Sequence, residues 1–239
     1  MRSISNKLTW ITLFSVAMGF LETAVVIYLR KMYYPNGFSF PLVPIGADIA
    51  RVEFLREAAT VVMLIGIGVI AGRTPALRFA YFIYCFAIWD IFYYVFLKLF
   101  INWPASFFTC DILFLIPIPW VGPVLAPCIL SITMCLLALV IIYYSEKGYA
   151  VSIAYKEWRL LIFGSLVVLF SFTKDYLDIL FMKKNQQVWT LAGKQSMFNE
   201  MNSYILGSYN WCLFLIGELV ILYSIYVFIR RIKNSRRAI

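Results

Sequence analysis

Three charged residues at the start of an apolar segment have the spacing of a polar site. The run R-V-E-F-L-R-E-A-A-T places Glu53, Arg56 and Glu57 at positions i, i+3 and i+4, which share one face of a helix. A charged group in hydrocarbon is strongly disfavoured unless it is paired or solvated, so we expect Arg56 to point into a helix bundle and to meet a carboxylate. The cluster indicates either a binding site or a ladder of ion pairs that ties helices together.

A second polar stripe lies in the next apolar segment, W-D-I-F-Y-Y-V-F-L-K. Asp90, Tyr93 and Tyr94 recur there at helical spacing, although tyrosines are equally typical of the aromatic belt at a membrane interface. Asp90 lies deeper in the segment and needs a partner. Arg56 is the expected partner, with Glu22 of the first apolar segment as the rival.

The segment from residue 102 to residue 127 is rich in proline and cannot form one continuous helix. Each proline removes a backbone donor and clashes with the preceding turn. Irregular backbone at membrane depth needs protein or water around it. We therefore expect a short half-helix or re-entrant turn near 105–117, a break at Pro117–Pro119 and a helix resuming near Trp120, with Asp111 capping it or facing a cavity. The alternative is an interfacial loop followed by a kinked helix.

One further acid lies inside the last apolar segment. Glu218 stands among leucine, isoleucine, glycine and valine, with no charged residue nearby in the sequence. A lone glutamate at this depth is either protonated or paired across the bundle, and either state makes it a candidate proton-carrying group.

Composition and length define the scaffold that must position these side chains. The chain has 239 residues, of which 63% are hydrophobic and 14% charged, too little polar surface for a soluble globule of this size. We predict an all-α, polytopic integral membrane protein forming a single transmembrane domain, 1–239, with a proline-broken fourth segment. The expected spans are roughly 8–29, 52–71, 79–101, 112–144, 160–181 and 204–229.

The distribution of Lys and Arg predicts the orientation. More of them flank the side that carries both termini, chiefly through the C-terminal run R-R-I-K-N-S-R-R, so both termini are expected in the cytoplasm. In this topology only Glu146 and Glu157 of the twelve acids fall on the cytoplasmic side, whereas Glu218 lies near mid-membrane and the others lie towards the outer side. Chain size and compact loops favour a bacterial inner membrane.

The sequence excludes several chemistries. With no histidine, the chain by itself has no ligand for His-bound haem or zinc and no imidazole for catalysis. The five cysteines are scattered, which is typical of buried thiols, and we predict no metal site or cofactor, although clustered carboxylates are ligands that Mg²⁺ accepts. The net charge of +9 is interpreted as lipid contact and not as nucleic-acid binding.

These observations predict a charged cavity in the outer half of the membrane, and no catalytic residue is assigned. Three functions fit it: binding of a small polar or ionic solute or a lipid headgroup in a transport-like protein, catalysis on a lipid or isoprenoid-linked substrate at the outer leaflet, or a non-catalytic subunit or assembly factor. The bilayer is the expected partner, together with another membrane protein or a second copy of the chain. The predicted binding residues are Glu22, Arg56, Glu57, Asp90, Tyr93, Tyr94, Asp111 and Glu218.

Overall fold

Six long helices and one strand pair make up the part of the chain that the computed structural model describes, residues 2–40, 43, 45–116, 118–182 and 209–234. The helices are α1 (Arg2–Tyr33), α2 (Ala47–Ala71), α3 (Pro75–Ile101), α4 (Leu125–Glu146), α5 (Tyr155–Met182) and α7 (Trp211–Asn234), and the strands are β1 (Cys110–Phe114) and β2 (Trp120–Pro123). All six helices are long and apolar enough to cross a membrane, which supports a multi-pass membrane protein.

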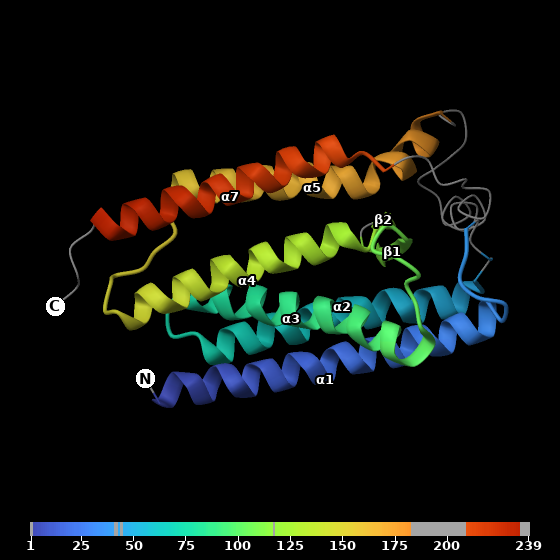
Figure 1. Cartoon of the computed structure of the whole chain (residues 1–239), viewed down its shortest axis with the longest axis horizontal. Coiled ribbons are helices and arrows are strands. Elements are labelled where there is room, and N and C mark those ends of the chain that lie inside the picture. The colour runs from blue at the N-terminus through green and yellow to red at the C-terminus, as the bar shows by residue number, and fades with distance from the viewer. Residues whose placement is uncertain (1, 41–42, 44, 117, 183–208, 235–239) are drawn as a thin grey trace.

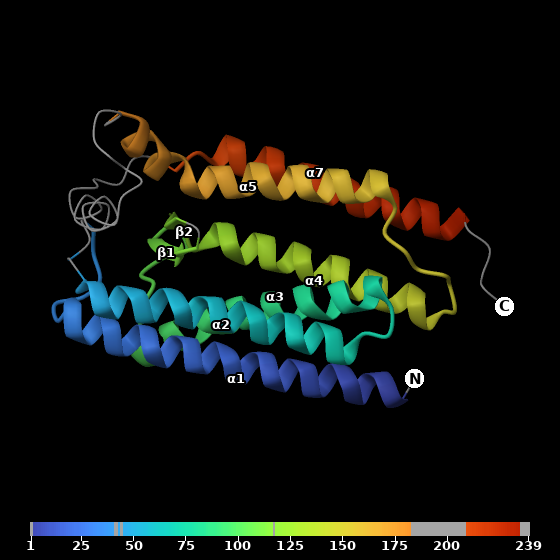
Figure 2. The same ribbon diagram turned by 180° about the vertical axis from the view of Figure 1, so that it is seen from behind.

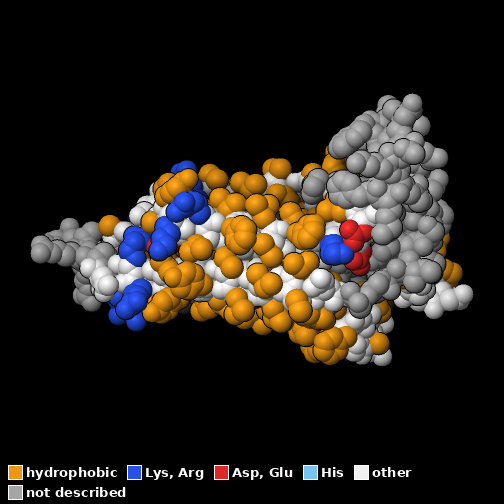
Figure 3. Space-filling view, turned by 90° about the horizontal axis from the view of Figure 1, so that it is seen from above, with side chains coloured by type: hydrophobic (Ala, Val, Ile, Leu, Met, Phe, Trp, Pro, Cys, Tyr) orange, Lys and Arg blue, Asp and Glu red, His pale blue; other side chains and the backbone are white. Residues whose placement is uncertain are grey.

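The helices run along the long axis of the molecule, and both termini lie at one end (Figure 1). On the face shown in Figure 3, apolar side chains cover the middle of the bundle, and Lys and Arg gather at the end with the termini. An even number of spans places both termini on one side of a membrane. The assignment of that side to the cytoplasm stays a prediction.

Helix α3 is the centre of a four-helix group, because it packs against α1, α2 and α4. Helices α5 and α7 form a second layer, visible from both sides (Figures 1 and 2), which contacts the first group through α4 and β2. The α5–α7 contact is backbone to backbone. A Cβ atom on Gly164 would lie 2.9 Å from the carbonyl oxygen of Gly217, and one on Gly217 would lie 2.8 Å from that of Gly164.

Six spans are confirmed, with shifted boundaries. Helix α1 extends beyond the expected 8–29 at both ends, and α2 begins at Ala47 instead of residue 52. The last span was expected from 204, but residues 204–208 lie outside the described part of the chain, and α7 begins at Trp211.

The predicted half-helix near 105–117 is wrong, and the fourth span does not resume at Trp120. The chain forms an antiparallel strand pair there, with Asp111 opposite Gly122, and α4 begins only at Leu125. Proline-rich sequence excludes a helix but tolerates short strands, because each strand of a two-stranded pair has one unpaired edge. The run C-D-I-L-F also carries aliphatic and aromatic side chains that favour extended backbone.

The strand pair continues the line of α4 at the end opposite the termini (Figure 1). On one side, the Trp120 ring stacks on the Phe172 ring of α5 at 6.3 Å between centroids. On the other side, Asp111 reaches Arg30 of α1. The strand pair thus lies between α5 and α1, so protein covers this irregular backbone on two sides.

Candidate functional site

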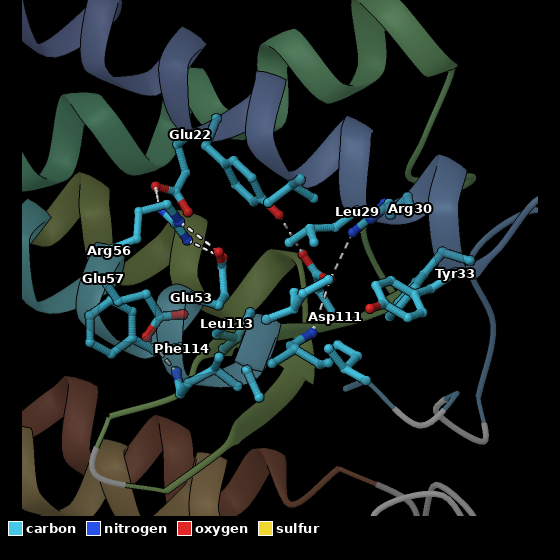
Figure 4. A pocket seen from close by; sticks show the side chains of 18 of the residues that line it. Glu22, Leu29, Arg30, Tyr33, Glu53, Arg56, Glu57, Asp111, Leu113 and Phe114 are labelled. Carbon is cyan, nitrogen blue, oxygen red and sulfur yellow. Dashed lines mark hydrogen bonds and ion pairs between the residues drawn. The ribbon is translucent and has the colours of Figure 1, made fainter. Parts of the chain in front are cut away.

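A cavity of about 150 Å³ lies at the end of the bundle opposite the termini, between α1, α2, α3 and β1 (Figure 4). Its walls are mainly aliphatic and aromatic. Its charged lining residues are Glu22, Arg30, Glu53, Arg56, Glu57, Asp90 and Asp111. The close-up shows the charged groups that α1, α2 and β1 contribute, and Asp90 of α3 lines the same cavity. A pocket with a few converging polar groups is the usual form of a ligand site.

Arg56 lies between two carboxylates. Its Nη1 donates to Glu22 of α1, its Nε donates to Oε2 of Glu53 at 2.9 Å, and its Nη2 donates to the second Glu53 oxygen (Figure 4). The expected pair between Arg56 and Asp90 is therefore not formed, and the rival Glu22 takes its place. Arg56 and Glu53 are one helical turn apart on α2 and face α1 together.

Glu57 and Asp90 have a different environment, because each is held by a neutral donor. The backbone N–H of Leu115 donates to Glu57 Oε2 at 2.9 Å, and Ser131 Oγ donates to Asp90 Oδ2 at 2.8 Å. Within the described residues, neither carboxylate has a basic side chain within 4.0 Å. Both line the cavity.

Asp111 is the most enclosed acid of the site, with 2% of its side chain exposed. Its Oδ1 accepts from Arg30 Nη2 at 2.9 Å and from the backbone N–H of Ile112, and its Oδ2 accepts a long 3.4 Å bond from Tyr93. Burial raises the pKa of Asp111 to about 6, against the lowering effect of the Arg30 charge.

Arg30 is the residue that the sequence interpretation missed. It is 8% exposed and lines the cavity. Its guanidinium lies 3.7 Å from the centroid of the Trp103 ring and 4.4 Å from that of Phe38. A basic residue at the end of an apolar segment is ordinarily a topology signal, so its sequence position alone does not indicate burial.

The cavity brings together most of the predicted binding residues but not Tyr94 and Glu218. Tyr94 packs with Leu97 and Val124 beside the cavity. Glu218 lies in the interior between α7 and α4, where Thr133 donates a hydrogen bond to it. The predicted residues that line the cavity are Glu22, Arg56, Glu57, Asp90, Tyr93 and Asp111.

No metal cluster is found in the described ranges: no group of three or more Cys, Asp or Glu side chains has an arrangement that could hold a metal ion. What the cavity does offer is an excess of acid, since five carboxylates and two guanidinium groups line it. Such a lining favours positively charged ligand groups over neutral ones.

Comparison with known proteins identifies no relative of this chain. No family model, curated protein or solved structure matches the chain. The function proposed below is therefore supported by the cavity and its charges.

Proposed function

We propose that this multi-pass membrane protein binds the positively charged group of a small polar solute or of a lipid headgroup in the cavity, in a transport-like role. The observation that carries the proposal is the pair Glu57 and Asp90, two cavity carboxylates without a basic partner in the described part of the chain. With cytoplasmic termini, as the charge distribution predicts, the cavity belongs to the outer half of a bacterial inner membrane.

Charge balance supports a cationic ligand group. The Arg56 guanidinium offsets one charge of the Glu22–Glu53 pair, and Arg30 offsets Asp111. The remaining carboxylates have only neutral hydrogen-bond donors, and a buried acid in that position is strongly disfavoured in its charged form. A protonated amine entering the cavity supplies the missing charge and donates hydrogen bonds to the same oxygens.

The walls suit a ligand with a short carbon chain. Aliphatic and aromatic side chains from α1, α2 and β1 line the cavity beside the charged groups. A compact primary ammonium with a few methylenes fills such a space. The apolar lining includes Val26, Leu29, Ile49, Leu113 and Phe114.

Binding of ethanolammonium to the purified protein in phosphatidylglycerol nanodiscs tests the proposal. The double variant Glu57→Gln/Asp90→Asn keeps side-chain size and removes both charges, and we expect it to weaken binding by about tenfold or more. The matched control is Asp48→Asn, because the Asp48 side chain lies on α2 outside the cavity and is 94% exposed. Equal affinity of the wild type and the double variant would refute the proposed function.

A further inference from the structure

Arg30 has an incomplete set of hydrogen-bond partners. Its Nη2 donates to Asp111, whereas its Nη1 is buried and has no partner among the described residues. The side chain is only 10% exposed. A buried guanidinium N–H without an acceptor is costly, so it calls for an oxygen that the described protein does not supply.

The plane of this guanidinium is fixed by its neighbours. The Trp103 and Phe38 rings lie against it and are themselves in edge-to-face contact, with centroids 5.8 Å apart and planes at 89°. Asp111 holds one edge. These contacts fix the plane of the guanidinium, and a planar arginine fork is well suited to an anionic oxygen of a phosphate group.

A simple anion is a poor ligand for this cavity. The carboxylates exceed the guanidinium groups by three, counting five of the former and two of the latter. The repulsion from Glu22, Glu53 and Glu57 would oppose a phosphate that carries only negative charge. An anionic group can reach Arg30 favourably when the same molecule brings a cation to the acids.

Resting on the proposed function, we propose that the ligand is a phosphoethanolamine group, with its phosphate on Arg30 Nη1 and its ammonium towards Glu57 and Asp90. Arg30, Glu57 and Asp90 all line the same cavity of about 150 Å³, so one small zwitterion can meet the guanidinium and the acids together. An α-amino acid has its two charged groups on one carbon. Phosphoethanolamine separates them by an ester oxygen and two methylenes.

The depth of Arg30 fits a lipid source of this group. Arg30 lies in the last turn of α1, whose apolar span ends at Tyr33. Lipid phosphates lie at the corresponding level of a bilayer. A free phosphoethanolamine molecule carries the same chemistry, so the test includes both sources.

The test measures four probes on the protein in phosphatidylglycerol nanodiscs: ethanolammonium, O-phosphoethanolamine and methyl phosphate in solution, and phosphatidylethanolamine mixed into the nanodisc and counted by native mass spectrometry. In the wild type, at least one phosphoethanolamine form should bind about tenfold or more tightly than ethanolammonium, and methyl phosphate most weakly. Preference for the lipid form identifies a headgroup, and preference for the soluble form identifies a solute.

The deciding variant is Arg30→Gln/Asp111→Asn, which removes both members of the ion pair and leaves no unpaired buried charge. It should lose the advantage of phosphoethanolamine over ethanolammonium, whereas Arg51→Gln/Asp48→Asn, an exposed ion pair of the same type, should keep it. If ethanolammonium binds and neither phosphoethanolamine form binds more tightly, the inference fails and the proposed function stands. If no probe binds, both fail.

Discussion

Two ion pairs with a buried carboxylate lie at opposite ends of the bundle, and they differ in how completely their hydrogen-bonding groups are satisfied. Near the termini, Arg231 of α7 contacts Glu157 of α5 through Nε at 2.7 Å and Nη2 at 2.9 Å. Glu157 also accepts from the backbone N–H of Ala154 at 2.8 Å, and Arg231 donates to the carbonyl oxygen of Ser152. At the other end, Arg30 and Asp111 share one 2.9 Å contact, and Arg30 Nη1 has no partner among the described residues.

The difference distinguishes a contact completed by protein groups from a candidate ligand site. The Glu157–Arg231 pair joins α5 to α7 and has its oxygens occupied by protein. Neither residue lines the cavity at the other end of the bundle. The Arg30–Asp111 pair borders a cavity, and Arg30 Nη1 is a buried donor without an acceptor in the described part of the chain. This arrangement is expected where a ligand completes the hydrogen bonds.

The largest loss of stability should come from replacing only one member of the Arg30–Asp111 ion pair. Arg30→Gln leaves Asp111 buried without its cation, and we expect the free energy of unfolding to fall by about 3–5 kcal/mol. Thermal unfolding in nanodiscs measures this. Arg30→Gln/Asp111→Asn should recover part of the loss. A single variant as stable as the wild type would contradict the ion pair as described.

Breaking the other pair should matter less. Glu157→Gln leaves Arg231 with its side chain 36% exposed, so water can replace the lost acceptor, and we expect a loss of about 1–2 kcal/mol. Binding of ethanolammonium should be unchanged, because the pair lies far from the cavity. If Glu157→Gln weakened ligand binding as much as Glu57→Gln/Asp90→Asn does, the Glu157–Arg231 pair could no longer be distinguished from the cavity as a purely structural contact.

The titration of Asp111 sharpens the comparison. Because burial raises its pKa to about 6 from 3.8, the folded state binds this proton more tightly than the unfolded state. The contribution of Asp111 to the free energy of unfolding therefore decreases as pH rises through this window. Below about pH 6 the acid becomes neutral and Arg30 loses its carboxylate charge. An infrared carboxyl band that titrates near pH 6 and is missing in Asp111→Asn checks this.

Two helices face Asp111 with groups that bear on this titration: α1 with Arg30, and α3 with Tyr93 and Tyr94. Arg30→Gln should move the pH midpoint of the infrared carboxyl band upwards, since the Arg30 charge lowers the pKa of Asp111. A band that titrates below pH 4 in the wild type would mean that the acid is well solvated.

The smallest effect is expected from the exposed pair on α2. Asp48 and Arg51 are 94% and 76% exposed, so Arg51→Gln/Asp48→Asn should change the free energy of unfolding by less than about 0.5 kcal/mol. Thermal unfolding of the variant in nanodiscs measures this change. A loss comparable to that of Arg30→Gln would show that burial is not what distinguishes the ion pairs of this protein.

The sequence predicts the spans and much of the cavity for a physical reason. Hydrophobic length defines helices in a membrane, and acids inside such helices must face protein or water. Glu22, Glu57 and Asp90 are such acids, and all three line the cavity. Glu218 also faces protein, but it lies outside the cavity and accepts a hydrogen bond from Thr133 of α4. No sequence pattern predicts this pairing.

The strand pair and Arg30 could not be predicted in this way. The prolines between residues 104 and 127 exclude one continuous helix through this segment but do not choose between a loop, a half-helix and strands near 105–117. The burial of Arg30 depends on Trp103 and Asp111, which are far from it in the sequence and reach it only when the strands fold back between the helices.

The most direct test of the ligand site is a cryo-EM map of the protein in nanodiscs that contain phosphatidylethanolamine. We expect density in the cavity that contacts Arg30 Nη1 at one end and approaches Glu57 and Asp90 at the other. A closed cavity, with these side chains paired to one another and no density between them, would contradict the proposed function and would make the charged groups structural ion pairs.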